Sequence, residues 1–131
     1  MRRVLIAAAS LLVLLVLGSS LRAQRGEPVF LGDRHVDGAM DHDVIHVGKH
    51  EGWFRAIQFR VEGGAVEFDR VVVHFGNGTE ERLDVRERIP DGGSTRAIDL
   101  PGDRRHIENV ELWYGKARWE RRPRVALFGI R

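Results

Sequence analysis

Short apolar segments recur throughout residues 24–131, and glycine, proline, asparagine and aspartate separate them. Their spacing of about 8–12 residues is typical of a protein built from short β-strands. Residues 53–62 show the pattern clearly, because Ile57, Phe59 and Val61 alternate with polar neighbours and therefore face one side of a strand. We predict an all-β fold, an antiparallel β-sandwich of about eight strands, with a closed β-barrel as the second expectation.

The predicted strands cover residues 29–31, 44–47, 53–62, 66–75, 82–85, 95–100, 107–114 and 125–130. The clearest turn is Gly76-Asn77-Gly78-Thr79, because Asn-Gly tolerates the positive backbone angles of a tight hairpin. Residues 71–75 should therefore pair with residues 82–85.

Two segments of the chain resemble two later segments at an offset of about 40 residues. Residues 55–59 resemble residues 96–100, and residues 68–76 resemble residues 107–115. One hypothesis is that two similar strand pairs are related by a pseudo-twofold axis. The alternative is that alternating apolar strands resemble one another by chance.

The N-terminus has the composition of a secretory signal peptide. Arg2 and Arg3 precede an apolar run of about 14 residues, and small residues follow it. A comfortable membrane span needs roughly 20 apolar residues. We expect residues 1–23 to form a signal helix that is cleaved after Ala23, and residues 24–131 to form a single β-sandwich domain. Cleavage after Ser20 and retention as an uncleaved membrane anchor are the alternatives.

The overall charge reflects the predicted signal segment. The chain has 21 basic and 19 acidic residues, but residues 1–23 contain three of the basic ones and no acidic one, which leaves 18 basic and 19 acidic residues. We therefore expect no nucleic-acid partner, and membrane contact only through an uncleaved signal segment. The predicted location is periplasmic or secreted. Because the chain has no cysteine, it forms no disulfide there, and its stability must come from the core.

Catalytic chemistry has little support in the sequence. Residues 24–131 contain no cysteine and only one serine, Ser94, which lacks the second glycine of a nucleophile elbow because Arg96 stands there. Paired carboxylates for glycoside hydrolysis depend on three-dimensional separation, and a domain this small leaves little room for a substrate cleft. We expect a protein without enzymatic activity and without a cofactor.

Residues 33–50 concentrate potential metal ligands, with four of the six histidines and four aspartates. Imidazole with carboxylate suits zinc, copper or nickel, and carboxylates alone suit calcium. His42 and His46 would lie about 13 Å apart on an extended strand, so chelation of one divalent ion would need a bend or a partner from elsewhere. A polar loop beside an edge strand is the alternative. The candidate metal ligands are His35, Asp37, Asp41, His42, Asp43 and His46.

Aromatic side chains are the candidates for binding a sugar ring or a protein partner. Trp53, Trp113, Tyr114 and Trp119 have this character. Tyr114 should share a strand face with Leu112, and Trp113 should lie on the opposite face, so one of the two aromatic residues should be more exposed than the other. Trp119 lies in a basic segment, where it could bind an anionic glycan or a lipid headgroup, or pack under arginines instead. The candidate binding residues are Trp113, Arg118, Trp119 and Arg121.

Several segments resemble a family of small exported bacterial proteins that includes the YaaI-like proteins and is classed as a domain of unknown function. They are Leu31-Gly32, residues 55–59, the turn at residues 89–93 leading to Thr95, and residues 125–129. The resemblance implies export and one β domain, and it carries over no active site. We expect a non-enzymatic binding or structural module of the cell envelope, with a glycan or a protein as its partner. The alternative is a periplasmic metal-binding protein that uses residues 33–50.

Overall fold

The computed structural model describes residues 26–37, 42–85, 87–115 and 122–131. The predicted signal segment, residues 1–23, lies outside these ranges. The described residues contain strands and loops, and none of them forms a helix that is long and apolar enough to cross a membrane.

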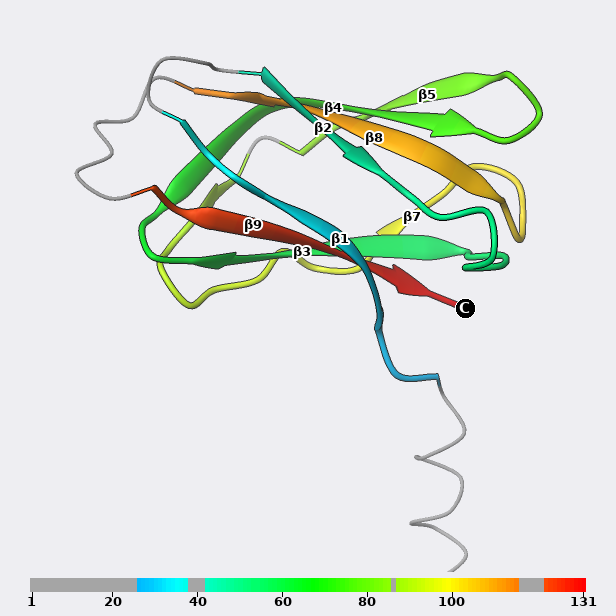
Figure 1. Ribbon diagram of the computed structural model, residues 1–131, viewed down its shortest axis with the longest axis horizontal. Helices are drawn as coiled ribbons and strands as arrows, with labels where there is room; N and C mark the ends of the chain where they lie inside the picture. Colours follow the sequence, from blue (N-terminus) through cyan, green and yellow to red (C-terminus); the bar gives the residue numbers. More distant parts are fainter. Residues whose placement is uncertain (1–25, 38–41, 86, 116–121) are drawn as a thin grey trace, which may run out of the picture.

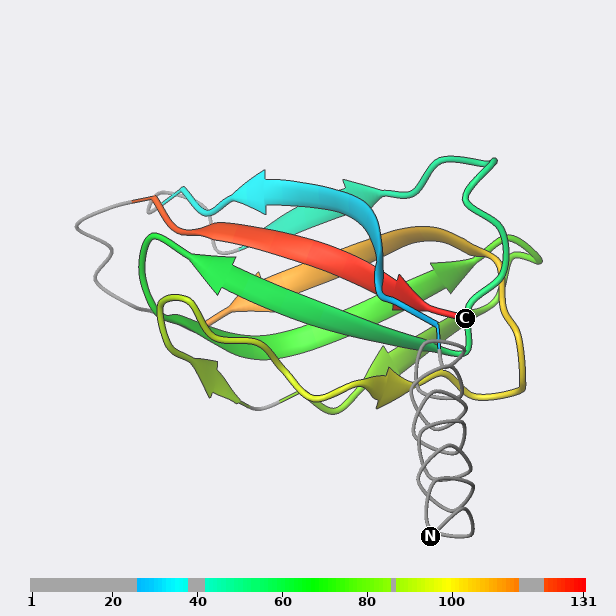
Figure 2. The same ribbon diagram turned by 90° about the horizontal axis from the view of Figure 1, so that it is seen from below.

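Two antiparallel sheets lie one above the other (Figures 1 and 2). The four-stranded sheet has the order β1-β9-β3-β7, and in the five-stranded sheet the order is β2-β8-β4-β5, with β6 also paired to β4. The all-β prediction is confirmed, and two open sheets form in place of the closed barrel of the second expectation. The described residues form nine strands: β1 (Val29–His35), β2 (His42–His46), β3 (Ala56–Glu62), β4 (Val66–Phe75), β5 (Glu80–Leu83), β6 (Arg88–Ile89), β7 (Ile98–Asp99), β8 (Ile107–Tyr114) and β9 (Arg124–Ile130).

The core lies between the sheets and follows the alternation of the strands. Ile57, Phe59 and Val61 are all fully buried, as their spacing on β3 predicts. The ring of Phe59 contacts the ring of Phe68 on β4 at a centroid distance of 5.1 Å. Contacts of this kind join the two sheets, and the buried apolar area supplies the main stabilisation.

A β-bulge interrupts the pairing of β4 with β8. Phe68 pairs with Tyr114 and Arg70 pairs with Trp113, so the extra residue lies at Asp69. The bulge lets Phe68 and Val71 both face the core although they are three residues apart. It also places Arg70 on the outer face, directly beside Trp113.

The predicted hairpin forms, since β4 pairs with β5 through Val71↔Leu83 and Val73↔Glu81, but its second strand covers residues 80–83 and not the predicted 82–85. Gly78 N–H donates to the Phe75 carbonyl at 3.0 Å, and only Gly78 in this turn has a positive φ, of 85°. Asn77 keeps an ordinary backbone conformation and instead accepts a hydrogen bond from the Thr79 amide through Oδ1, at 3.1 Å. The turn is therefore a type I turn followed by a glycine bulge.

The segments that resemble each other in sequence are neighbours in the sheets. Ile57 pairs with Ile98, and Val72 pairs with Glu111, so residues at matching places in the two segments face each other across antiparallel ladders. The pseudo-twofold relation between the two strand pairs stays a prediction.

The predicted strand at residues 95–100 is much shorter in the structure, where β7 covers only Ile98–Asp99. The buried hydroxyl of Thr95 accepts a hydrogen bond from Phe59 N–H at 3.0 Å and donates one to the Arg96 carbonyl at 2.8 Å. Side-chain bonding to the main chain thus replaces part of the expected ladder.

Candidate functional site

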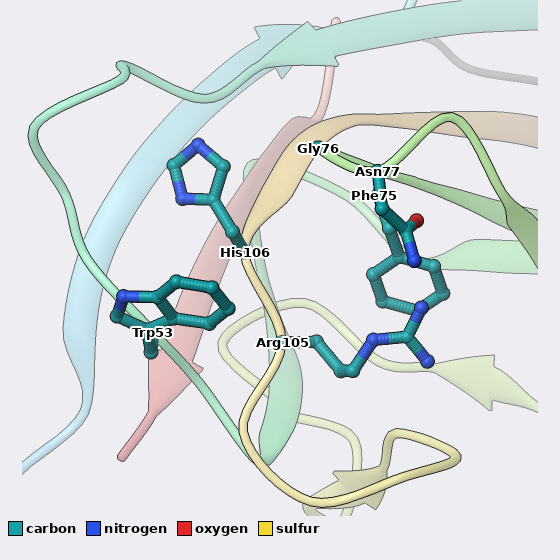
Figure 3. Close-up of a pocket in the computed structure, with 6 residues that line it drawn as sticks. All are labelled: Trp53, Phe75, Gly76, Asn77, Arg105 and His106. Carbon is teal, nitrogen blue, oxygen red and sulfur yellow. The ribbon is translucent and has the colours of Figure 1, made fainter.

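An open pocket lies at the end of the sandwich where the loop before β3, the β4–β5 turn and the loop before β8 meet (Figure 3). It has a volume of about 300 Å³. In Figure 3 Trp53 and His106 lie on one side, and Phe75 and Asn77 lie on the other. We call it the Trp53 pocket, and its lining residues are Trp53, Phe75, Gly76, Asn77, Arg105 and His106.

Trp53 faces outward because its neighbour Phe54 is anchored in the core. Phe54 is fully buried, and its amide and carbonyl exchange hydrogen bonds with Arg105 at 2.8 and 2.7 Å. Successive side chains of an extended segment point in opposite directions. The indole of Trp53 is therefore left 60% exposed at the mouth of the pocket.

Arg105 forms part of the pocket wall and is held on three sides. Its guanidinium stacks over the Phe75 ring at 3.8 Å from the centroid. Nη1 donates to the Pro101 carbonyl at 2.8 Å and Nη2 donates to the Thr79 hydroxyl at 3.0 Å. These contacts give a flexible side chain one orientation, which is a condition for specific recognition.

His106 lies between Trp53 and the β4–β5 turn. Its Nδ1 donates to the Gly52 carbonyl at 3.1 Å, and its ring lies 5.9 Å from the indole of Trp53. Gly76 makes this position possible, because a Cβ atom there would lie 2.5 Å from Cδ2 of His106. The imidazole therefore packs directly against the main chain of the turn.

Trp113 and Tyr114 lie on opposite faces of β8, as predicted. The structure shows that Trp113 is on the outer face of the five-stranded sheet and that Tyr114, only 3% exposed, is on the inner face. His42 stacks on the indole of Trp113 at 4.5 Å, and the guanidinium of Arg70 lies over that indole at 3.8 Å. Trp113 thus already contacts two side chains of this chain, which leaves less of its ring for a ligand than Trp53 offers.

Glu111 joins two histidines beside Trp113. Its carboxylate accepts hydrogen bonds from Nε2 of His42 at 2.8 Å and from Nε2 of His74 at 2.5 Å. Glu80 lies 3.4 Å from the other ring nitrogen of His74. The hydrogen bond from His42, and then that from His74, lowers the pKa of Glu111 below its usual range. The carboxylate lies between the two imidazoles and bridges them.

Asp43 follows His42 on β2 and points to the opposite face, into the sandwich. Burial raises the pKa of Asp43, against the effect of a hydrogen bond with Tyr114. Burial and the neighbouring charge of Asp43 raise the pKa of Tyr114 as well. Asp43 therefore contributes to the inner packing of β2 and β8.

The predicted metal ligands are spread over both faces of two strands. His35 and Asp37 are exposed at the end of β1, and His46 is exposed opposite Asn109. No three histidine, aspartate or glutamate side chains within the described ranges come together as a metal site. Asp41 lies outside the described residues, so the metal site remains a prediction.

Three predicted binding residues, Arg118, Trp119 and Arg121, lie outside the described residues as well. Sequence reasoning named Trp53 as an aromatic candidate but missed Arg105 and His106. Their signal was weak, because each is a polar residue in a loop. The Phe54–Arg105 pairing, which joins loops 51 residues apart, and the hydrogen bond from His106 to the Gly52 carbonyl bring them to Trp53.

Comparison with known proteins gives a family and a fold. Residues 9–129 match the family described as Domain of unknown function (DUF2541). No curated protein matches the chain. AlgX of Pseudomonas aeruginosa is similar in structure, with a TM-score of 0.53 and 9% identity, over 80% of this chain and 27% of AlgX. A mutant of a carbohydrate binding module of family 29 matches with a TM-score of 0.31 and 13% identity, over 82% of this chain and 79% of that one.

Proposed function

The chain belongs to the DUF2541 family, and we propose that it is a non-enzymatic binding module that holds a glycan at the Trp53 pocket. The observation that carries this proposal is the 60% exposed indole of Trp53 at the mouth of an open pocket of about 300 Å³. A large aromatic ring at such a place is costly to hydrate and offers a flat apolar surface to the face of a sugar ring.

The surrounding polar groups support recognition of a hydroxyl-bearing ligand. Arg105 and Asn77 lie at the pocket beside the apolar ring of Phe75. Pockets that combine an apolar surface with a few oriented polar groups bind small ligands and distinguish between them. Among the described residues, the pocket lining contains no carboxylate and no serine, threonine or cysteine, which favours binding over catalysis.

Export to the cell envelope belongs to the same proposal. Its support is the charged, apolar and small-residue order of residues 1–23. The finer resemblance to the YaaI-like proteins is part of the proposal too, and it rests on the strand and turn segments from Leu31 to Gly129. A periplasmic or secreted module would meet envelope or extracellular polysaccharides directly.

Affinity electrophoresis tests the glycan proposal. Protein purified after expression of the full chain is run through gels that contain dextran, galactomannan, polygalacturonate or methyl-esterified polygalacturonate. We expect at least one polymer to retard the protein, and Trp53→Ala to weaken that retardation about tenfold or more.

Phe30→Ala is the matched control, because Phe30 is also an exposed aromatic residue, at 48%, and contacts Phe128 on the four-stranded sheet. Its retardation should equal that of the unaltered protein. The proposal is wrong if no polymer retards the protein, or if Trp53→Ala and Phe30→Ala behave alike.

A further inference from the structure

The polar groups of the Trp53 pocket are unevenly divided between donors and acceptors. Oδ1 of Asn77 already accepts from the Thr79 amide at 3.1 Å and from the Thr79 hydroxyl at 2.6 Å. A backbone amide only donates, so the amide group of Asn77 has one possible orientation, with its NH2 left for another partner. The Thr79 hydroxyl oxygen in turn accepts from Arg105.

Two main-chain oxygen atoms near the pocket also accept hydrogen bonds from its lining residues. The Pro101 carbonyl accepts from Arg105, and the Gly52 carbonyl accepts from His106. A guanidinium has five N–H groups, and the two hydrogen bonds of Arg105 leave several of them available. The side chains of Arg105 and Asn77 therefore offer N–H donors to a ligand.

The charge of the pocket also favours a ligand that accepts hydrogen bonds and carries a negative charge. Its lining includes one permanent cation, Arg105, and no acidic side chain among the described residues. Both hydrogen bonds that Arg105 donates go to neutral oxygens, so its charge is not cancelled by them.

We propose that the Trp53 pocket selects an acidic sugar, a pyranose ring that carries a carboxylate. This inference rests on the proposed glycan binding and names the substrate class of the same site. The sugar ring stacks on Trp53, while the carboxylate accepts hydrogen bonds from Arg105 and from the NH2 group of Asn77. A carboxylate supplies only acceptors, which complements the N–H donors that Arg105 and Asn77 present.

The test compares polygalacturonate with its fully methyl-esterified form in affinity gels, because the ester keeps the ring and removes the charge. We expect the acidic polymer to be bound about tenfold more tightly. Asn77→Asp should abolish that preference, since its carboxylate still accepts from Thr79 but replaces the NH2 donor with a negative oxygen. Asn109→Asp, on β8, gives the same change in net charge away from the pocket and should leave the preference intact.

The outcomes distinguish failure of the acidic-sugar inference from failure of the proposed glycan binding. Equal binding of the acidic and esterified polymers, lost in Trp53→Ala, would overturn the acidic-sugar inference and leave glycan binding standing. A preference that Asn77→Asp and Asn109→Asp weaken equally would reveal a general charge effect and would also overturn the inference. Failure of every polymer to bind would overturn both.

Discussion

The ring of Phe54 occupies the space that a side chain at position 129 would need. A Cβ atom on Gly129 would lie 2.5 Å from Cδ1 of Phe54. Phe54 in turn pairs with Arg105 and leaves Trp53 exposed, so the close packing of β9 against one buried ring supports the whole pocket.

Gly129→Ala should therefore destabilise the protein and disturb the pocket together. We expect a loss of about 1–3 kcal/mol in the free energy of unfolding, because the ring of Phe54 must move in a filled core. Urea unfolding measures it. Gly48→Ala is the control, since its Cβ atom would meet only ordinary contacts with Glu51 at 3.7 Å. Equal stability of the two variants would contradict this account of Phe54.

Thr95→Val should cost about 1–3 kcal/mol of unfolding free energy although it preserves the shape of the side chain. The hydroxyl of Thr95 is the acceptor for the buried Phe59 amide at 3.0 Å, and valine leaves that donor unpaired. Ser94→Ala changes the exposed neighbouring hydroxyl and should stay within about 0.5 kcal/mol of the unaltered protein. Thermal unfolding of the three proteins at one pH shows whether Thr95 stabilises the fold through its hydrogen bond to Phe59 or only through the packing of its side chain.

Glu111→Gln should lower stability at neutral pH by about 1 kcal/mol, because the carboxylate holds His42 and His74 through charge-assisted hydrogen bonds. The pKa of Glu111 is lowered in the folded state. Its contribution is therefore present above the unfolded pKa of about 4.3 and is lost as the pH falls through the folded pKa. The difference between the unaltered protein and Glu111→Gln should shrink below about pH 4. The exposed Glu81→Gln is the control, and an equal effect from it would contradict the bridging role.

Asp43→Asn should have the opposite pH dependence. Burial raises the pKa of Asp43 in the folded state, so the stability that its protonated form contributes is lost as the pH rises through the folded pKa. Asparagine keeps an oxygen for the Tyr114 hydroxyl and never ionises. The variant should gain stability relative to the unaltered protein between acidic and neutral pH, measured by melting temperature. Asp99→Asn, on an exposed position of β7, should show no such gain.

Much of the fold could be predicted from local patterns. The alternation along β3 identified Ile57, Phe59 and Val61 as core residues, and the Gly76–Thr79 turn identified the β4–β5 hairpin. The opposite faces of Trp113 and Tyr114 followed from the same geometry. The predicted strand at residues 95–100 failed at Thr95. In the sequence, a threonine whose hydroxyl bonds to the main chain cannot be distinguished from a threonine in a strand.

The sequence by itself determined which side chains turn inward, because the two-residue period of a strand is a local property of the chain. Only the tertiary structure decided which outward residues meet. Trp53, Asn77 and His106 come from three separate loops, and the Phe54–Arg105 pairing together with the β4–β8 register brings those loops to one end of the sandwich. Register and sheet packing depend on contacts between residues far apart along the chain, and a local period does not specify them.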